Sequence, residues 1–125
     1  MVIAKRRSIL AVDDAPMVLR LLSDILKDCY DIILSKDGEQ AIRLAKEYLP
    51  DLVLLDVIMP NISGFDVLKA LKSDPATAGI PVILVTGSDN ENTEADGYTA
   101  GAIDFIKKPF IPSVIRHKVN LILNI

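Results

Sequence analysis

The chain alternates between short apolar runs and longer stretches in which apolar and polar residues are mixed. The apolar runs are rich in Val, Ile and Leu and hold few polar residues, which is typical of parallel β-strands covered on both faces. The pattern predicts five such strands. We expect them at Ile9–Val12, Ile32–Leu34, Leu52–Leu55, Val82–Val85 and Ile103–Ile106.

The stretches between these runs predict helices, because their apolar residues return every three to four positions. The signal is clearest from Pro16 to Cys29, where apolar pairs recur every four residues. It is weakest at Asn90–Ala100, which is polar and contains Gly97. The other helices are expected at Asp37–Leu49, around Phe65, Leu68 and Leu71, and at Pro112–Leu123.

Strands that alternate with helices predict an α/β fold with a parallel sheet, right-handed crossovers and helices on both faces. A length of 125 residues fits one domain over 1–125. In open parallel sheets, ligands bind beyond the carboxyl ends of the strands. The candidate site is therefore expected at that edge.

The composition narrows the function classes. A net charge of −3 and a pI near 5.0 disfavour direct nucleic-acid binding, because phosphate backbones attract basic faces. We expect no membrane insertion, because no apolar run is long enough to span a bilayer and the start lacks a secretory signal pattern. The single cysteine, Cys29, fits a reducing compartment, so a cytoplasmic location is expected.

Five reactive side chains follow four of the predicted strands. Asp13 and Asp14 come after the first strand and Asp56 after the third, while Thr86 and Lys108 come after the fourth and fifth. Four of them have an ordinary local explanation. Asp14 could be a helix N-cap, Asp56 could begin a turn, Thr86 could be a strand residue that bonds its own backbone, and Lys108 could be a solvent-facing strand end. Since all five converge on one edge, a shared site is favoured over separate explanations.

The side-chain chemistry indicates phosphoryl transfer. Three neighbouring carboxylates need a counter-charge, and a set of oxygen ligands favours Mg²⁺, with Mn²⁺ as a substitute, over zinc. The Lys108 ammonium and the Thr86 hydroxyl add donors suited to a phosphoryl group. Asp56 is the candidate nucleophile, because a carboxylate can accept phosphoryl to give an aspartyl phosphate.

At this point the sequence resembles the response-regulator receiver domain of two-component signalling, over essentially its whole length. The resemblance rests on the acidic pair Asp13-Asp14, on DVIMPNISG at 56–64, on Thr86-Gly87 and on KPF at 108–110. It implies a flavodoxin-like (βα)5 sandwich with strand order 2-1-3-4-5. It also implies a phosphohistidine donor, which is a sensor histidine kinase or a histidine phosphotransfer protein.

The resemblance also implies a role for each matching residue. Asp56 would be the phosphoacceptor, and Lys108 would contact a phosphoryl oxygen. Asp13, Asp14 and the Ile58 carbonyl would hold Mg²⁺ together with Asp56. The remaining roles are a switch formed by Thr86 and Phe105, in which the ring turns inward, and phosphate-binding backbone at Ile58 and Gly87. Met59, Pro60 and Gly64 would shape the loop.

Two positions bear on the lifetime of the phosphorylated form. Ile58 is apolar and Ser88 is small and uncharged, so neither side chain is suited to orient an attacking water. We therefore expect slow self-dephosphorylation, and a phosphoacceptor rather than a conventional turnover enzyme.

Other site chemistries fit less well. Metal-dependent phosphatases and phosphotransferases with a carboxylate nucleophile commonly carry an acid-x-acid motif after the first strand, whereas these acids are adjacent. Neither the phosphate-binding G-x-x-x-x-G-K pattern nor G-x-G-x-x-G occurs. The only histidine, His117, falls in the last predicted helix and is expected at the surface, away from the site.

Output is expected through contact with a downstream protein target or a fused output domain. Whether the chain acts alone or is one domain of a longer regulator stays open. The last helix carries more apolar residues than one face can bury, including Ile111, Val114 and Leu121. These are either scattered exposed residues or a homodimer or partner face formed by the fourth helix, fifth strand and fifth helix.

Overall fold

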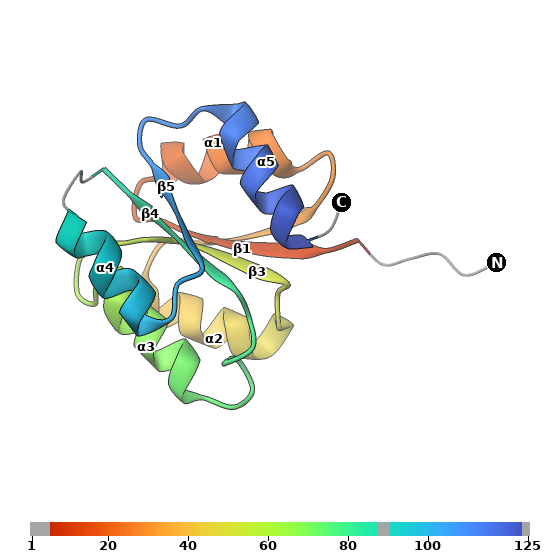
Figure 1. Cartoon of the computed structure of the whole chain (residues 1–125). Coiled ribbons are helices and arrows are strands. Elements are labelled where there is room, and N and C mark those ends of the chain that lie inside the picture. The colour runs from red at the N-terminus through yellow and green to blue at the C-terminus, as the bar shows by residue number, and fades with distance from the viewer. Residues whose placement is uncertain (1–5, 88–90, 124–125) are drawn as a thin grey trace.

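The structure, a computed structural model, describes residues 6–87 and 91–123. Five strands alternate with five helices, as the hydrophobic pattern predicts (Figure 1). The strands are β1 (Ser8–Val12), β2 (Asp31–Ser35), β3 (Leu52–Asp56), β4 (Val82–Thr86) and β5 (Asp104–Lys107). The helices are α1 (Pro16–Leu26), α2 (Gly38–Tyr48), α3 (Gly64–Ser73), α4 (Glu91–Ala100) and α5 (Pro112–Leu123).

The strands form one parallel sheet in the order β2-β1-β3-β4-β5. Helices α1 and α5 cover one face, and α2, α3 and α4 cover the other (Figure 1). This confirms the flavodoxin-like architecture. The chain order reverses between β1 and β3, so the carboxyl ends of these two central strands flank the switch point where ligands bind in such sheets.

Each face of the sheet has its own apolar core. Strand residues point alternately to the two faces, so Leu10 and Val53 pack under α2 and α3, whereas Ile9 and Leu54 pack under α1 and α5. The strand β3 is buried along its whole length, including Asp56 at its end. The central strands are therefore a rigid support for residues at their carboxyl ends.

The helix α1 is shorter than predicted, and only part of its predicted apolar face is buried. It ends at Leu26 rather than at Cys29, because the Cys29 and Tyr30 amides both bond back to the Leu26 carbonyl and turn the chain into β2. Its buried residues are Leu19, Leu22 and Leu26. By contrast, Met17 is 84% exposed. In each apolar pair of the predicted helix face, the second residue is more buried than the first.

The helices α2 and α3 begin with side-chain caps. The Asp37 carboxylate accepts a hydrogen bond from the Gln40 amide at 2.7 Å. At α3, Ser63 and Asp66 form a reciprocal capping box. The box fixes the start of α3 at Gly64, directly after the loop that follows β3.

On the α4–β5–α5 face, the helix α4 buries few of its described residues, whereas the strand β5 is held by several hydrogen bonds. Gly97 is the buried residue of α4 among those whose side chains are described, and the predicted first residue, Asn90, lies outside the described residues. Lys118 of α5 donates a hydrogen bond to the Phe105 carbonyl of β5 at 2.7 Å and another to the Asp104 carboxylate at 3.0 Å. The Phe105 amide donates to the same Asp104 oxygen at 2.7 Å. The strand begins at Asp104, one residue later than predicted.

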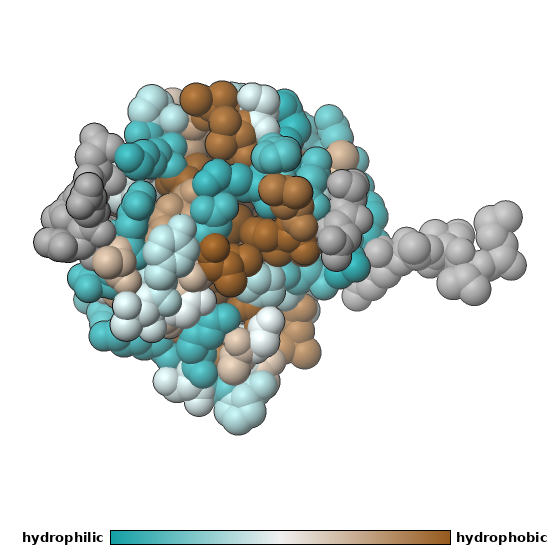
Figure 2. Space-filling view, in the orientation of Figure 1, coloured by the Kyte–Doolittle hydropathy of each residue, from teal (hydrophilic) through white to brown (hydrophobic). Residues whose placement is uncertain are grey.

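Several apolar side chains on this face are open to solvent. Figure 2 shows apolar residues gathered near β5 and α5. Within α5, Leu121 is 66% exposed and Val114 is 40% exposed, which confirms that α5 carries more apolar residues than the core accepts; Ile111, directly before the helix, is 60% exposed. His117 is exposed, as expected. Within the described ranges, the helices are too short or too polar to cross a bilayer.

Candidate functional site

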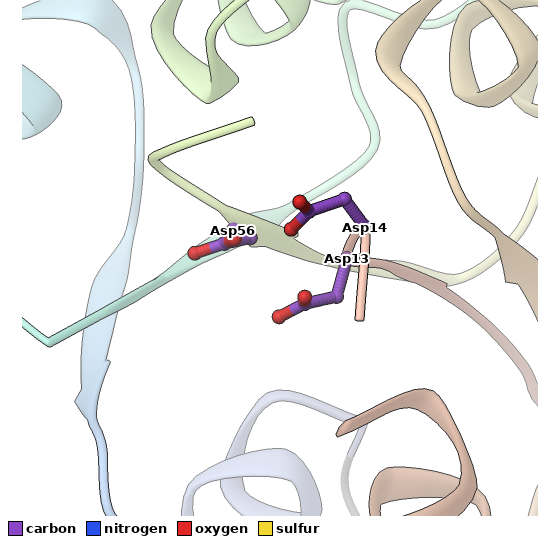
Figure 3. Close-up of side chains that lie close together, drawn as sticks. All are labelled: Asp13, Asp14 and Asp56. Atoms are coloured by element: carbon purple, nitrogen blue, oxygen red, sulfur yellow. The ribbon is translucent and has the colours of Figure 1, made fainter. Parts of the chain in front are cut away.

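Three carboxylates meet at the carboxyl ends of β1 and β3, as the sequence predicts (Figure 3). One oxygen from each of Asp13, Asp14 and Asp56 lies within 4.8 Å of the others. Asp13 and Asp56 are buried at 1% and 5% exposure, whereas Asp14 faces solvent. The cluster is therefore closed to solvent at Asp13 and Asp56 and has one open side, at Asp14.

The Lys108 ammonium lies between the two buried carboxylates. Its Nζ is 3.0 Å from Asp13 Oδ2 and 3.5 Å from Asp56 Oδ1. The backbone places it there, because the Lys108 amide bonds to the Thr86 carbonyl at 2.8 Å at the end of β4. The Lys108–Pro109 peptide bond that follows is cis.

The electrostatics of the cluster follow from this geometry. Burial raises the pKa of Asp56 to about 6, and the negative charge of Asp13 adds to the shift. Lys108 and a backbone hydrogen bond from Ile58 oppose it. For Lys108 itself, burial would lower the pKa, but the combined pull of Asp13 and Asp56 outweighs burial and raises it. Without a further cation, the ionised form of Asp56 is thus disfavoured.

Asp13 and Asp14 make different contacts, and neither residue is the N-cap of α1. The N-cap position is Ala15, followed by Pro16, and no side chain caps the helix there. The local explanation of Asp14 as a cap is therefore wrong. Asp13 Oδ1 instead accepts a hydrogen bond from the Ala15 amide at 2.9 Å, which leaves Asp14 directed toward the cluster (Figure 3).

The loop after β3 passes close behind the nucleophile candidate. The Gly64 amide donates to the Val57 carbonyl at 2.8 Å, and a Cβ at Gly64 would lie 2.1 Å from the Asp56 carbonyl oxygen. Only a glycine fits there without moving backbone. The Ile58 side chain is 74% exposed, so its backbone rather than its side chain faces Asp56.

Thr86 and Gly87 are two further predicted site residues, at the end of β4 and directly after it. Thr86 is 1% exposed at the end of β4. A Cβ at Gly87 would meet nothing within 4 Å, so steric crowding does not explain this glycine. Ser88 lies outside the described residues.

Phe105 does not lie in the acidic cluster. Its ring is 4% exposed, belongs to the core under α2, α3 and α4, and meets the Tyr98 ring edge-to-face at a centroid distance of 5.0 Å. The structure therefore describes this aromatic residue in an inward orientation.

The cluster fits a small, hard divalent cation. Its donors are carboxylate oxygens, with the exposed Asp14 on the open side, and a lone Lys108 does not balance three anions. Mg²⁺ takes few protein carboxylates and keeps several waters, which suits a cluster with one open side. Soft-metal ligands are absent among the described residues of the cluster.

Comparison with known proteins identifies the family. The profile described as the response regulator receiver domain matches residues 9–120. The chain therefore belongs to the receiver-domain family of two-component response regulators, as the motifs indicate.

Curated relatives show how the domain is used elsewhere. The chain is 37% identical over 113 residues to a probable cyclic di-GMP phosphodiesterase of Vibrio cholerae, covering 90% of this chain and 26% of that protein. It is 34% identical to protein PilH of Pseudomonas aeruginosa, covering 92% of this chain and 96% of PilH. The chain thus spans about a quarter of the first relative and nearly all of the second. Other relatives are named as DNA-binding or transcriptional regulators, so the expected absence of nucleic-acid binding is not confirmed.

Solved structures agree with the fold. The chemotaxis protein CheY4 of Vibrio cholerae aligns with a TM-score of 0.90 and 26% identity, over 94% of this chain and 99% of that one. A putative response regulator from Chloroflexus aurantiacus aligns with a TM-score of 0.91 and 30% identity, over 97% of this chain and all of that one.

The sequence predicted the reactive groups but not the backbone contacts and close approaches that position them. The close approach behind Gly64 was anticipated only as loop shape. The hydrogen bond from Ala15 to Asp13 leaves no pattern in sequence, because any residue supplies the amide. Gly97 was interpreted only as a weak point in a helix, although a buried helical glycine signals a close neighbour.

Proposed function

We propose that this chain is the phosphoacceptor domain of a phosphorelay and that Asp56 receives the phosphoryl group. The observation that carries the proposal is the buried Asp56 carboxylate, which adjoins Asp13 and Asp14 and lies 3.5 Å from Lys108. A nucleophile, a metal-ligand set and a phosphate-binding ammonium thus share the carboxyl end of the sheet.

The transfer step moves one phosphoryl group between two proteins. An oxygen of ionised Asp56 attacks the phosphorus of a phosphohistidine, the P–N bond breaks, and the bond electrons stay on the imidazole nitrogen, which then takes a proton from solvent. The product on this chain is an aspartyl phosphate. Mg²⁺, held by Asp13, Asp14, Asp56 and the Ile58 carbonyl, would neutralise charge on the transferring oxygens.

The chain's own groups prepare Asp56 for attack and hold the product. Lys108 favours the ionised form of Asp56 and is placed to contact a phosphoryl oxygen. The Ile58 and Gly87 amides are the backbone donors that we assign to the phosphoryl group. Thr86, at the end of β4, would move to bond it, and Phe105 would report that movement on the α4–β5–α5 face.

We propose that the donor docks beside the cluster, on α1. Met17, Val18 and Leu21 form, with Pro109 and Phe110, an apolar pocket of about 460 Å³ that also includes Lys108. Because the pocket shares Lys108 with the acidic cluster, a protein seated there would bring its phosphohistidine to Asp56. The proposed occupant is therefore an apolar surface of the donor protein.

This docking proposal has a direct test. Leu21→Glu should slow transfer from a phosphohistidine protein while leaving labelling by acetyl phosphate unchanged, since the small donor needs no docking surface. Leu121→Glu, at an exposed leucine of α5, is the matched control. Equal slowing by both variants would contradict the assignment to α1.

We further propose that the aspartyl phosphate hydrolyses slowly and that the chain is a switch rather than a turnover enzyme. The Ile58 side chain is apolar and 74% exposed, so it is not suited to orient an attacking water. After labelling in the presence of Mg²⁺, decay over seconds would count against this proposal.

For its output, we propose that residues 1–125 act as one receiver domain in the cytoplasm, through protein contacts and without direct nucleic-acid binding. The downstream target, a fused output domain or a second copy would meet the α4–β5–α5 face, where Ile111, Val114 and Leu121 are exposed. Sedimentation with and without a phosphate mimic tests the homodimer: a mass that does not change on adding the mimic would remove it.

The central claim is tested by incubation with acetyl phosphate and Mg²⁺, followed by intact mass. The unaltered chain and Asp28→Ala, at an exposed aspartate of the α1–β2 turn, should each gain one phosphoryl group. Asp56→Ala should gain none. Labelling of Asp56→Ala to the same extent as the unaltered chain would overturn the proposal.

A further inference from the structure

The helix α4 touches the core through a residue with no side chain. Gly97 is buried in the middle of a helix whose described neighbours, Ala95, Asp96, Tyr98 and Thr99, are exposed. A Cβ at Gly97 would lie 2.4 Å from Phe105 Cζ and 2.7 Å from Leu84 Cδ1. The Phe105 ring thus occupies the space that a side chain at Gly97 would fill.

This choice of residue works against the helix itself. Glycine in a helix interior is disfavoured relative to alanine because it loses more backbone freedom on folding. The α4 sequence, ENTEADGYTA, offers no compensating apolar stripe. The close contact with Phe105 is the physical reason the structure gives for a glycine here.

The ring has an open space beside it. On its solvent side, Phe105 and Tyr98 line a groove of about 370 Å³ together with Ile111, Val114 and Lys118. A Phe105 ring that left the slot under Gly97 would enter this groove. The backbone would stay in place, because Asp104 and Lys118 bond the Phe105 amide and carbonyl.

We infer that Gly97 is the positioning residue for Phe105. Because Gly97 has no side chain, it leaves a slot on α4 that holds the Phe105 ring inward. This slot couples the orientation of the ring to the approach of α4. The ring stays in the slot only while α4 lies close, and displacement of either releases the other. This inference rests on the proposed function in one respect, which is that Phe105 reports the state of Asp56.

Gly97→Ala tests the slot by NMR. In the unaltered chain, the Phe105 ring protons should show cross-peaks to the Gly97 α-protons and the Leu84 methyls. In Gly97→Ala these contacts should be lost and replaced by contacts to Ile111 and Val114, which line the groove. Thr99→Ala, an exposed position of the same helix, should leave the pattern unchanged. A ring in Gly97→Ala that keeps its Leu84 contact and meets the new methyl would overturn the inference.

A second variant decides the case in which Gly97→Ala does not fold. Gly97→Ala/Phe105→Leu shortens the side chain that the new methyl meets, so it should regain the folded spectrum. Failure of this double variant to fold, with Phe105→Leu alone folded, would also overturn the inference.

Labelling by acetyl phosphate in the same samples separates this inference from the proposed function. Loss of the ring contacts in a Gly97→Ala chain that still labels Asp56 supports the slot. An unaltered chain that does not label would remove the proposed function while the ring contacts still decide the slot.

Discussion

Lys108 Nζ lies 3.0 Å from Asp13 Oδ2 and 3.5 Å from Asp56 Oδ1, so one ammonium spans the two buried carboxylates of the site. The cation comes from the end of β5 and the anions from the ends of β1 and β3. Removing one member of a buried charge cluster leaves the others unpaired, which is more harmful than the net worth of the pair.

Lys108→Ala should therefore destabilise the metal-free chain near neutral pH. The expected loss in the free energy of unfolding is about 1–3 kcal/mol, measured by urea denaturation in EDTA. Mg²⁺ should restore part of it, because the metal replaces the missing charge, while the response to phosphorylation is impaired. Lys69→Ala, at an exposed lysine of α3, is the control. An equal loss in both variants would show that Lys108 does not stabilise the cluster.

The raised pKa of Asp56 predicts how stability depends on pH. The unfolded carboxyl releases its proton near pH 3.8 and the folded one near pH 6. Between these values the folded state binds more protons, so this group's contribution to the free energy of unfolding falls as pH rises, by about 3 kcal/mol in all, and levels off once the pH is well above 6. Asp56→Asn in EDTA should thus gain stability over the unaltered chain as pH rises through this window. A difference that stays constant with pH would contradict the prediction.

Asp14 should matter for metal binding and little for stability. It is exposed, and within the described cluster it supplies the oxygen on the open side. We expect Asp14→Asn to weaken Mg²⁺ binding about tenfold, which is about 1.4 kcal/mol, with an unchanged urea midpoint in EDTA. Titration calorimetry measures the affinity, and Asp28→Asn is the matched variant. Unaltered affinity in Asp14→Asn would remove this residue from the ligand set.

Gly64→Ala should disturb the loop that carries Ile58. The new Cβ would meet backbone atoms of Asp56 and Val57 at 2.1–2.9 Å, and backbone cannot give way as a side chain can. The expected loss in the free energy of unfolding is about 2–4 kcal/mol. Gly79→Ala, where a Cβ meets nothing within 4 Å, should change stability by less than about 1 kcal/mol. Thermal or urea unfolding of both variants decides this.

The pattern of apolar runs predicted all five strands within one or two residues, because each strand holds few polar residues, even β2, which is only partly buried. It was less reliable for α1. There the apolar residues come in adjacent pairs, and the choice of Leu22 over Leu21 depends on how the helix is rotated against β1, β2 and α5, which is a tertiary property. The end of α1 likewise depends on Tyr30 reaching the core.

The reactive residues were predicted because each directly follows a strand, and parallel strands bring their ends together. The relationships between them were not. Whether Lys108 bonds Asp13 or Asp56, or whether Asp14 caps a helix, depends on side-chain directions that spacing does not encode. Gly97 shows the same limit: its neighbour Phe105 is near in sequence, but their contact depends on how α4 lies over β5.

The bonding of Phe105 in β5 also limits how other chains can attach. A strand at the border of a sheet offers unpaired amides and carbonyls to which a foreign strand can add. Here Asp104 and Lys118 already occupy the amide and carbonyl of Phe105. A chain that tried to extend the sheet past β5 would first have to displace both side chains. Recognition at this border should therefore proceed through side-chain contacts, and growth of the sheet from β5 is hindered.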